Sequence, residues 1–314
     1  MNYLQPYKGK DTRHTCPSCK AKLSFTQYLD GNTHKPIDHT VGRCNRESKC
    51  GYHYTPKQFL MDNPSFVETR HTSTNNLAQL FSKQLTSQIG LIPIYYLENS
   101  ISYESNFVTF LKNHFSEEQI NTVLEKYLLG AAKNKEVIFW QIDIAGKVRT
   151  GKIMQYNPVT GKRLKHQSGA IDWVHNKLKK SGKLPEDFNL QQCFFGEHLL
   201  NIYPEKKVAI VESEKSAIIA SCIMPELVWL AAGNLNGLSL EKCQVLKDRN
   251  VAFLPDLGVY EKWGLKVIKI QKQCNCKITV STLLEYEATD TDRSNGLDIA
   301  DYIIAEIKAR KNFT

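Results

Sequence analysis

Acidic side chains follow two apolar runs in the last third of the chain. Glu212 comes directly after KKVAIV, and Asp256 ends NVAFLPD. Short apolar runs that alternate with helical patterns predict a parallel sheet, in which the carboxyl ends of neighbouring strands meet at one edge. Two carboxylates at that edge repel each other unless a cation lies between them, and oxygen ligands suit Mg²⁺ or Mn²⁺. We therefore expect a divalent metal at this edge.

Two further carboxylates, Asp298 and Asp301 in GLDIADYII, are expected at the start of the last helix. From there they would add oxygen ligands to the same metal site. The alternative is that each acid only caps a helix or carries a solvated charge. Asp298 suits a helix N-cap, and Glu214 suits the first turn of the helix after the first strand.

Four of the nine cysteines lie within the first 50 residues. The Cys16-Pro-Ser-Cys19 spacing is typical of a zinc knuckle, in which two thiolates on one turn bind the same ion. Cys44 and Cys50 complete a four-thiolate set, although their separation is longer than in a doubled C-x-x-C. His39 and His53 are alternative ligands, and free cysteines in a small core are the competing interpretation. Because so small a segment has little apolar material, we favour a structural zinc ribbon with no open coordination position.

Positive charge is concentrated in the middle of the chain. The formal net charge is +9, and residues 133–183 contain twelve Lys or Arg against three acidic residues. Fixed cations on strands and turns suit a phosphate backbone, and such binding would be largely independent of base sequence. A solvated basic face is the alternative. The candidate nucleic-acid-binding residues are Lys147, Arg149, Lys152, Lys162, Arg163 and Lys165.

The elements that must position these residues follow from apolar periodicity. Apolar spacing of three and four predicts helices over 76–85 and 107–130, with a start at Ser116 and a stop at Gly130. Alternating β-branched and aromatic residues over 136–155 predict two strands joined through Ala145-Gly146, and a second turn follows at 157–161. From 206 onward, strands and helices alternate.

Composition predicts a folded protein of two or three modules. The chain has 314 residues, of which 41% are hydrophobic and 23% charged. No apolar run is long enough to cross a membrane and the first residues lack the apolar stretch of a secretory signal, so a cytoplasmic location and no membrane partner are expected. The predicted parts are a zinc ribbon at 1–65, a linker at 66–76, a helical then α+β basic region at 77–203, and an α/β domain at 204–314.

Four motifs mark the final domain: Val-Glu-Ser-Glu-Lys-Ser-Ala after the first strand, Ala-Gly-Asn-Leu-Asn-Gly-Leu after the second, Leu-Pro-Asp after the third, and a late Asp-x-x-Asp. In this order they resemble the TOPRIM domain of bacterial-type primases, topoisomerases and some nucleases. The resemblance implies a Rossmann-like parallel sheet, with Glu212 as general acid or base and Asp256 as a metal ligand. Gly258 stands where the family usually has the second aspartate of Asp-x-Asp. The missing carboxylate puts full two-metal chemistry in doubt.

The order of zinc ribbon, basic segment and TOPRIM-like domain resembles that of bacterial and phage DNA primases, and also that of zinc-ribbon TOPRIM proteins of mobile genetic elements. CFFGEHLL at 193–200 is similar to the short element that precedes TOPRIM in primases. The resemblance implies metal-dependent nucleotidyl transfer on single-stranded DNA, with nucleoside triphosphates as substrates. Because the sequence contains no G-x-x-x-x-G-K-[ST] motif, a helicase or other replication partner is expected to be a separate protein.

Three classes of function compete on this evidence. A primase-like nucleotidyltransferase ranks first. A non-catalytic DNA-binding accessory protein ranks second, because Gly258 removes a carboxylate from the catalytic set. A metal-dependent TOPRIM nuclease ranks third.

Overall fold

The computed structural model describes residues 2–46, 49–63, 88–164, 171–234 and 236–311. The chain forms two units, Met1–Ser87 and Gln88–Thr314, and each is described by itself. The predicted linker and the predicted helix at 76–85 lie outside the described residues. Within the described ranges, no helix combines the length and the apolar character needed to span a membrane.

The first unit is built on a small antiparallel sheet. Its strands follow the order β1-β2-β3-β4. The helix α1 begins after Thr55, whose hydroxyl accepts from the backbone N–H of Gln58 while the Gln58 side chain accepts from the backbone N–H of Thr55. The elements are β1 (Tyr3–Leu4), η1 (Lys10–Thr12), β2 (Phe25–Leu29), β3 (Gly42–Cys44), β4 (His53–Tyr54) and α1 (Pro56–Asp62).

The apolar interior of this unit is small. One cluster consists of Cys16, Phe25 and Cys44, with Cys19, Cys50 and Tyr52 packed against it. A second consists of Ile37, Val41 and Phe59. Because most of the first cluster is cysteine, hydrophobic burial alone gives this sheet little stability.

The second unit begins with helices and an antiparallel sheet of order β5-β6-β7-β8. The predicted pair of strands over 136–155 is confirmed, since β6 and β7 are antiparallel neighbours. The predicted turn at 157–161 is confirmed by a hydrogen bond from the Gly161 N–H to the Asn157 carbonyl at 2.9 Å. The elements are α4 (Tyr95–Glu98), α5 (Asn106–Lys112), α6 (Glu117–Tyr127), β5 (Gly130–Ala131), η2 (Lys133–Lys135), β6 (Val137–Ile142), β7 (Val148–Met154), β8 (Asp172–Trp173), α7 (Val174–Lys180) and α8 (Leu199–Ile202).

Strand β6 is buried on both faces. Val137 and Phe139 belong to the main core, whereas Ile138, Trp140 and Ile142 belong to a second apolar cluster on the opposite face. Side chains of a strand alternate between faces, so each face of this hairpin contacts a different core. The hairpin is therefore held between two apolar clusters, and its turn at 144–147 is exposed.

Helix α6 starts as the sequence predicted and ends differently. Ser116 is its N-cap and forms a capping box with Gln119. The predicted stop at Gly130 is wrong: the helix ends at Tyr127, and Leu128 takes the left-handed conformation at φ 51°. Gly130 instead lies in β5, where its close neighbours are the side chains of Ser100 and Trp140.

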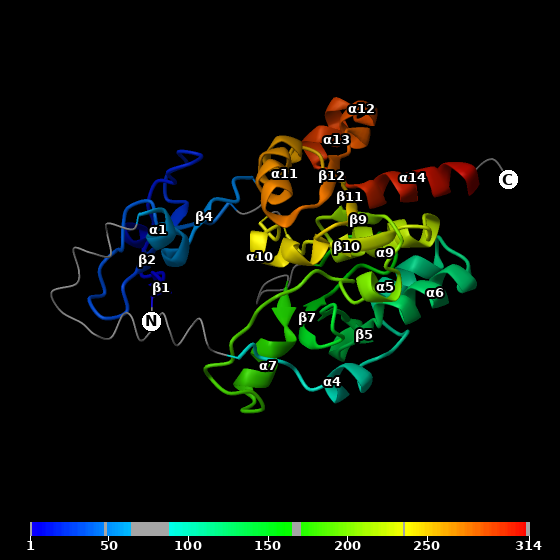
Figure 1. Cartoon of the computed structure of the whole chain (residues 1–314), viewed down its shortest axis with the longest axis horizontal. Helices are drawn as coiled ribbons and strands as arrows, with labels where there is room; N and C mark the ends of the chain where they lie inside the picture. The colour runs from blue at the N-terminus through cyan, green and yellow to red at the C-terminus, as the bar shows by residue number, and fades with distance from the viewer. Residues whose placement is uncertain (1, 47–48, 64–87, 165–170, 235, 312–314) are drawn as a thin grey trace. The chain divides into compact units, whose positions relative to one another are not determined.

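The last part of the chain forms a parallel sheet of order β10-β9-β11-β12. This confirms the predicted alternation of strands and helices. Figure 1 shows helices α9 and α14 lying near each other beside this sheet. The elements are β9 (Val208–Val211), α9 (Glu214–Ile223), β10 (Val228–Ala231), α10 (Leu240–Cys243), η3 (Gln244–Leu246), β11 (Asn250–Phe253), α11 (Tyr260–Cys274), β12 (Lys277–Val280), α12 (Leu283–Glu287), α13 (Asp290–Asn295) and α14 (Ile299–Lys311).

The two sheets of the second unit share one main core. That core runs from Phe107 in α5 to Ile304 in α14. Phe195 pairs with Ala231 at the end of β10 through two backbone hydrogen bonds of 3.1 Å, so the 193–200 segment is attached to the parallel sheet. The boundary between 203 and 204 stays a prediction, and residues on both sides of it pack together.

Candidate functional site

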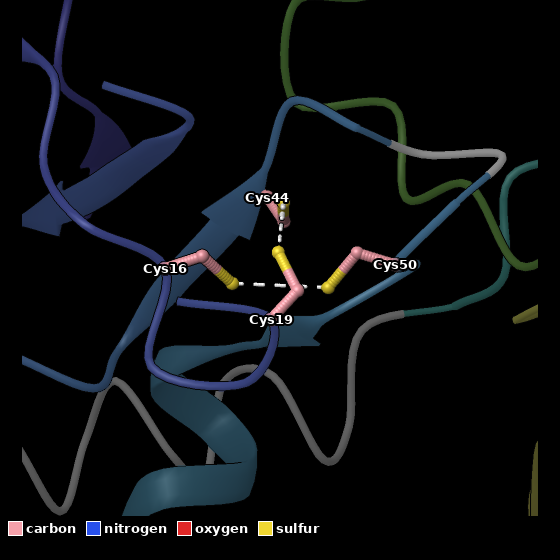
Figure 2. A group of neighbouring side chains, drawn as sticks. All are labelled: Cys16, Cys19, Cys44 and Cys50. Atoms are coloured by element: carbon pink, nitrogen blue, oxygen red, sulfur yellow. Dashed lines mark hydrogen bonds between the residues drawn. The ribbon is translucent and has the colours of Figure 1, made fainter. Parts of the chain in front are cut away.

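The cysteines of the first unit form one cluster. The Sγ atoms of Cys16, Cys19, Cys44 and Cys50 all lie within 4.8 Å of one another, and Figure 2 shows them pointing toward a common centre. The Cys16–Cys50 and Cys19–Cys44 sulfur distances are 3.8 and 3.9 Å. Sulfur atoms at the corners of a tetrahedral zinc site, each about 2.3 Å from the ion, are roughly 3.8 Å apart. The donor set therefore fits a structural zinc ion.

The alternative histidine ligands lie outside this cluster. His53 Nε2 is 3.0 Å from the Tyr28 hydroxyl, and the two rings are stacked. His39 is 3.4 Å from Asp38, and 83% of its side chain is exposed. Because four thiolates already complete the tetrahedral ligand set, neither histidine is needed as a zinc ligand.

The thiols of the cluster have unlike pKa values. Burial raises the pKa of Cys44 to about 12, and it also raises the pKa of Cys16. The backbone N–H of Ala21 lowers the pKa of Cys19 to about 7. Zinc binds thiolates, so a bound ion would keep all of them deprotonated.

The second site is the carboxyl edge of the parallel sheet. Strands β9 and β11 are parallel neighbours, with Ile210 opposite Phe253. Glu212 comes one residue after β9, and Asp256 three residues after β11. The two acids are close enough that Glu212 raises the pKa of Asp256. The predicted parallel pairing of the two strands that precede these acids is confirmed. A metal-binding role for Glu212 and Asp256 stays a prediction.

Asp298 and Asp301 reach the same edge from the start of α14. Asp298 Oδ1 accepts from the Asp301 N–H at 3.0 Å, and Asp301 Oδ2 accepts from the Asp298 N–H at 3.1 Å. The predicted capping role of Asp298 is confirmed. Its other oxygen accepts from the Ser216 hydroxyl at 2.8 Å, which ties α14 to α9.

The pKa of Asp256 is raised well above its ordinary value. Burial is the largest cause, followed by the charges of Asp298 and Glu212, whereas Lys215 acts in the opposite direction. A divalent cation beside Asp256 would favour its ionised form. Among the described residues, however, the four cysteines are the one group of three or more His, Cys, Asp or Glu side chains placed so that they could hold a metal ion together. The donor chemistry at this edge fits Mg²⁺, which keeps several waters and needs only one or two carboxylates.

Two lysines line this edge, and sequence reasoning assigned a role to neither. Lys215 lies in the first turn of α9, with its Nζ 3.3 Å from Asp301 Oδ1 and 3.7 Å from Asp298 Oδ2. Lys266 comes from α11; burial lowers its pKa, and the charge of Glu212 partly offsets that effect. The position of Lys215 could have been predicted from the Ser-Glu-Lys-Ser sequence after β9. This sequence starts a helix at the sheet edge, so the lysine had to lie near the acids there.

Gly258, two residues after Asp256, lies in a tight turn. Its φ is 83°, and the Val259 N–H donates to the Asp256 carbonyl at 3.2 Å. An added Cβ at Gly258 would meet nothing within 4 Å. Space is therefore available, but the left-handed backbone disfavours a side chain there.

A buried ion pair lies near the same helix start. Lys152 Nζ donates to Glu214 Oε2 at 2.9 Å and to the Gly233 carbonyl at 2.8 Å. Only 5% of the Lys152 side chain and 1% of the Glu214 side chain are exposed. Glu214 is thus the buried ion-pair partner of Lys152, and not the solvated charge of the first helix turn that we expected as the alternative. Lys152 is likewise buried and does not belong to the surface cations.

The other described candidates for phosphate binding lie in or beside the β6–β7 hairpin and after the 157–161 turn. Lys147 is exposed at the β6–β7 turn, and Lys162 and Arg163 are exposed after the 157–161 turn. Arg149 is 2.6 Å from Asp143, and 16% of its side chain is exposed. Lys165 lies outside the described residues. The structure thus places Lys147, Lys162 and Arg163 on the surface, and a nucleic-acid role for any of the six stays a prediction.

Two family models match parts of the chain. A zinc beta-ribbon finger family matches residues 1–65. A domain of unknown function, DUF6371, matches residues 105–257, from the helix before the hairpin sheet to the residue after Asp256. No curated protein sequence matches.

Several solved structures share a weak likeness with the chain. The primase fragment of the bacteriophage T7 primase-helicase protein is 11% identical, with 90% of this chain and 98% of that chain covered and a TM-score of 0.36. The zinc-binding and RNA polymerase domains of the Aquifex aeolicus primase are 12% identical, with coverage of 88% and 73% and a TM-score of 0.36. The DnaG catalytic core is 12% identical, with coverage of 65% and 78% and a TM-score of 0.39. At such scores, function has to be argued from the residues.

Proposed function

We propose that this protein is a primase-like enzyme, with a TOPRIM-type catalytic edge that joins nucleotides on a single-stranded DNA template. The proposal is supported by the positions of Glu212 and Asp256, which follow adjacent parallel strands at their carboxyl ends. Each follows its strand in the pattern by which the sequence resembles TOPRIM. The zinc ribbon and the exposed cations of the basic region support nucleic acid as the partner.

The reaction would be attack of a 3′-hydroxyl on the α-phosphorus of a nucleoside triphosphate, with pyrophosphate leaving. Asp256 and Glu212 would hold Mg²⁺ or Mn²⁺, with Asp298 and Asp301 completing the acidic edge. The ion supplies charge stabilisation for the phosphoryl oxygens. Glu212 would accept the proton of the attacking hydroxyl. Lys266, whose charge acts on Glu212, would lie at the border of this site.

Primer synthesis provides the direct test. The protein is incubated with single-stranded DNA, labelled ribonucleotides and Mg²⁺ or Mn²⁺, and short products are resolved by gel electrophoresis. We expect Glu212→Gln to lower product formation about 100-fold or more, because it removes a proton acceptor and a metal ligand while keeping the side-chain shape. Glu226→Gln, at an acid in the turn before β10, is the matched control and should retain product formation. Equal synthesis by Glu212→Gln and the parent protein would refute the catalytic assignment.

The second candidate function is a DNA-binding accessory protein without catalysis. Gly258 favours it, because the turn at this position supplies no second carboxylate. Salt-sensitive DNA binding that is unchanged in Glu212→Gln and Asp256→Asn, with no product from nucleotides, would support this role. Shortened DNA in the absence of nucleotides would instead indicate a nuclease. An origin on a mobile genetic element and a separate helicase partner are parts of the proposal that follow from the resemblance.

DNA binding by the basic region predicts a measurable salt effect. The double variant Lys162→Ala/Arg163→Ala should weaken binding to single-stranded DNA of any sequence. Each lost phosphate contact should reduce the slope of log K against log salt concentration by about 0.7, so we expect a change of roughly 1.4. Fluorescence anisotropy over a range of salt concentrations measures this slope. Arg310→Ala removes an exposed cation of α14 as the control, and a slope that falls equally there would contradict a specific role for Lys162 and Arg163.

A further inference from the structure

A lysine ammonium group lies among the carboxylates of the sheet edge. Lys215 Nζ is 3.3 Å from Asp301 Oδ1 and 3.7 Å from Asp298 Oδ2. Its side chain is only 18% exposed. Two carboxylates therefore form ion pairs with this cation, and the charge of Asp256 acts on it as well.

The position of this lysine is fixed from two sides. Ser213 caps α9 by accepting from the Ser216 N–H at 3.1 Å, which sets the first turn that carries Lys215. Ser216 then donates to Asp298 at 2.8 Å, and Asp298 and Asp301 cap α14 reciprocally. Both acids are therefore held toward Lys215 by contacts that do not involve a metal.

The charges at the edge leave room for one divalent ion. The charges of Glu212, Asp298 and Asp301 raise the pKa of Asp256. Lys215 forms ion pairs with Asp298 and Asp301, and the charge of Glu212 acts on Lys266. In formal charge, four carboxylates and two ammonium groups leave two negative charges, which equals the charge of a single Mg²⁺. Gly258 brings no further carboxylate, so a second divalent ion would have to displace the lysine or leave excess positive charge.

We propose that Lys215 is a built-in cation that takes the place of a second metal ion, so that the edge binds one divalent ion, through Glu212 and Asp256. This inference rests on the proposed metal-binding edge and makes it specific. Asp298 and Asp301 then position the lysine rather than bind the metal. Lys215 is a positioning residue, because it acts on the metal site through the neighbouring carboxylates.

Metal stoichiometry tests this inference without relying on activity. The zinc-loaded full chain is titrated with Mn²⁺, and bound ion is counted by electron paramagnetic resonance. We expect about one Mn²⁺ ion per chain for the parent protein and about two for Lys215→Met, since the variant frees Asp298 and Asp301 for an oxygen-ligated ion. Lys215→Arg keeps the cation and should bind one. Two ions in the parent protein, or no gain in Lys215→Met, would overturn the inference.

A second variant covers the case in which Lys215→Met does not fold. Asp301→Asn keeps the lysine and removes one of its partners. If Asp301 only positions Lys215, the Mn²⁺ dissociation constant should change less than about threefold, whereas the loss of a direct ligand should weaken binding tenfold or more. A tenfold loss would therefore contradict the inference.

The two proposals fail in different ways. A change from one ion to two in Lys215→Met without any primer synthesis would refute the proposed function and support the lysine inference. Primer synthesis by a parent protein that binds two ions would support the function and refute the inference.

Discussion

Replacement of Cys44 by serine should release the zinc and unfold the small sheet of the first unit, while the sheets of the second unit stay folded. Cys44 is fully buried, and with Cys16 and Phe25 it makes up the main apolar cluster of its sheet. Without the ion, that cluster keeps little apolar area to offset the entropy of folding. Structural zinc binding contributes about 10 kcal/mol or more in small zinc domains, so its loss exceeds the stability of such a unit.

Zinc content and folding are measured together. Mass spectrometry of the metal should find about one zinc per chain in the parent protein and much less in Cys44→Ser. The amide resonances of the first unit should lose their dispersion in the variant. Cys276→Ala, at a buried cysteine of the second unit, is the control and should keep its zinc. A variant Cys44→Ser that retains zinc and a folded sheet would show that the ligand set differs.

Replacement of Lys152 by methionine should lower the free energy of unfolding of the second unit by about 3–5 kcal/mol. The change removes the buried ammonium and leaves the Glu214 carboxylate without its ion-pair partner. Glu214 Oε1 has no hydrogen-bond partner among the described residues, so the carboxylate is bound through Oε2 by Lys152. Because both side chains are almost completely buried, solvent does not screen the loss.

Urea denaturation of the single and double variants separates the energy of the Lys152–Glu214 interaction from the effect of each substitution alone. Lys152→Met/Glu214→Leu should recover most of the lost stability, since an apolar pair of similar size costs little. Lys147→Met changes an exposed lysine of the same hairpin and should alter stability by less than about 0.5 kcal/mol. A loss below about 1 kcal/mol in Lys152→Met would show that the charge of Glu214 finds another partner.

The sequence determined the features that depend on local pattern. The spacing of Cys16 and Cys19 identified half of the zinc set, because a knuckle is a single turn of chain. The apolar runs before Glu212 and Asp256 placed both acids at strand ends, because buried parallel strands are continuous in hydrophobicity. The capping role of Asp298 also followed from local residue preference.

Tertiary structure decided which charged side chains are paired and buried. Lys152 belongs by sequence to a basic surface, yet it meets Glu214, 62 residues away. Lys215 meets Asp301 across 86 residues because α9 and α14 are neighbours in the fold. The local pattern of apolar and polar residues does not predict such contacts. A lysine or glutamate is expected to be exposed unless its partner, distant in the sequence, is known. The sequence thus located the acids of the sheet edge, and only the packing of α9 against α14 placed a lysine among them.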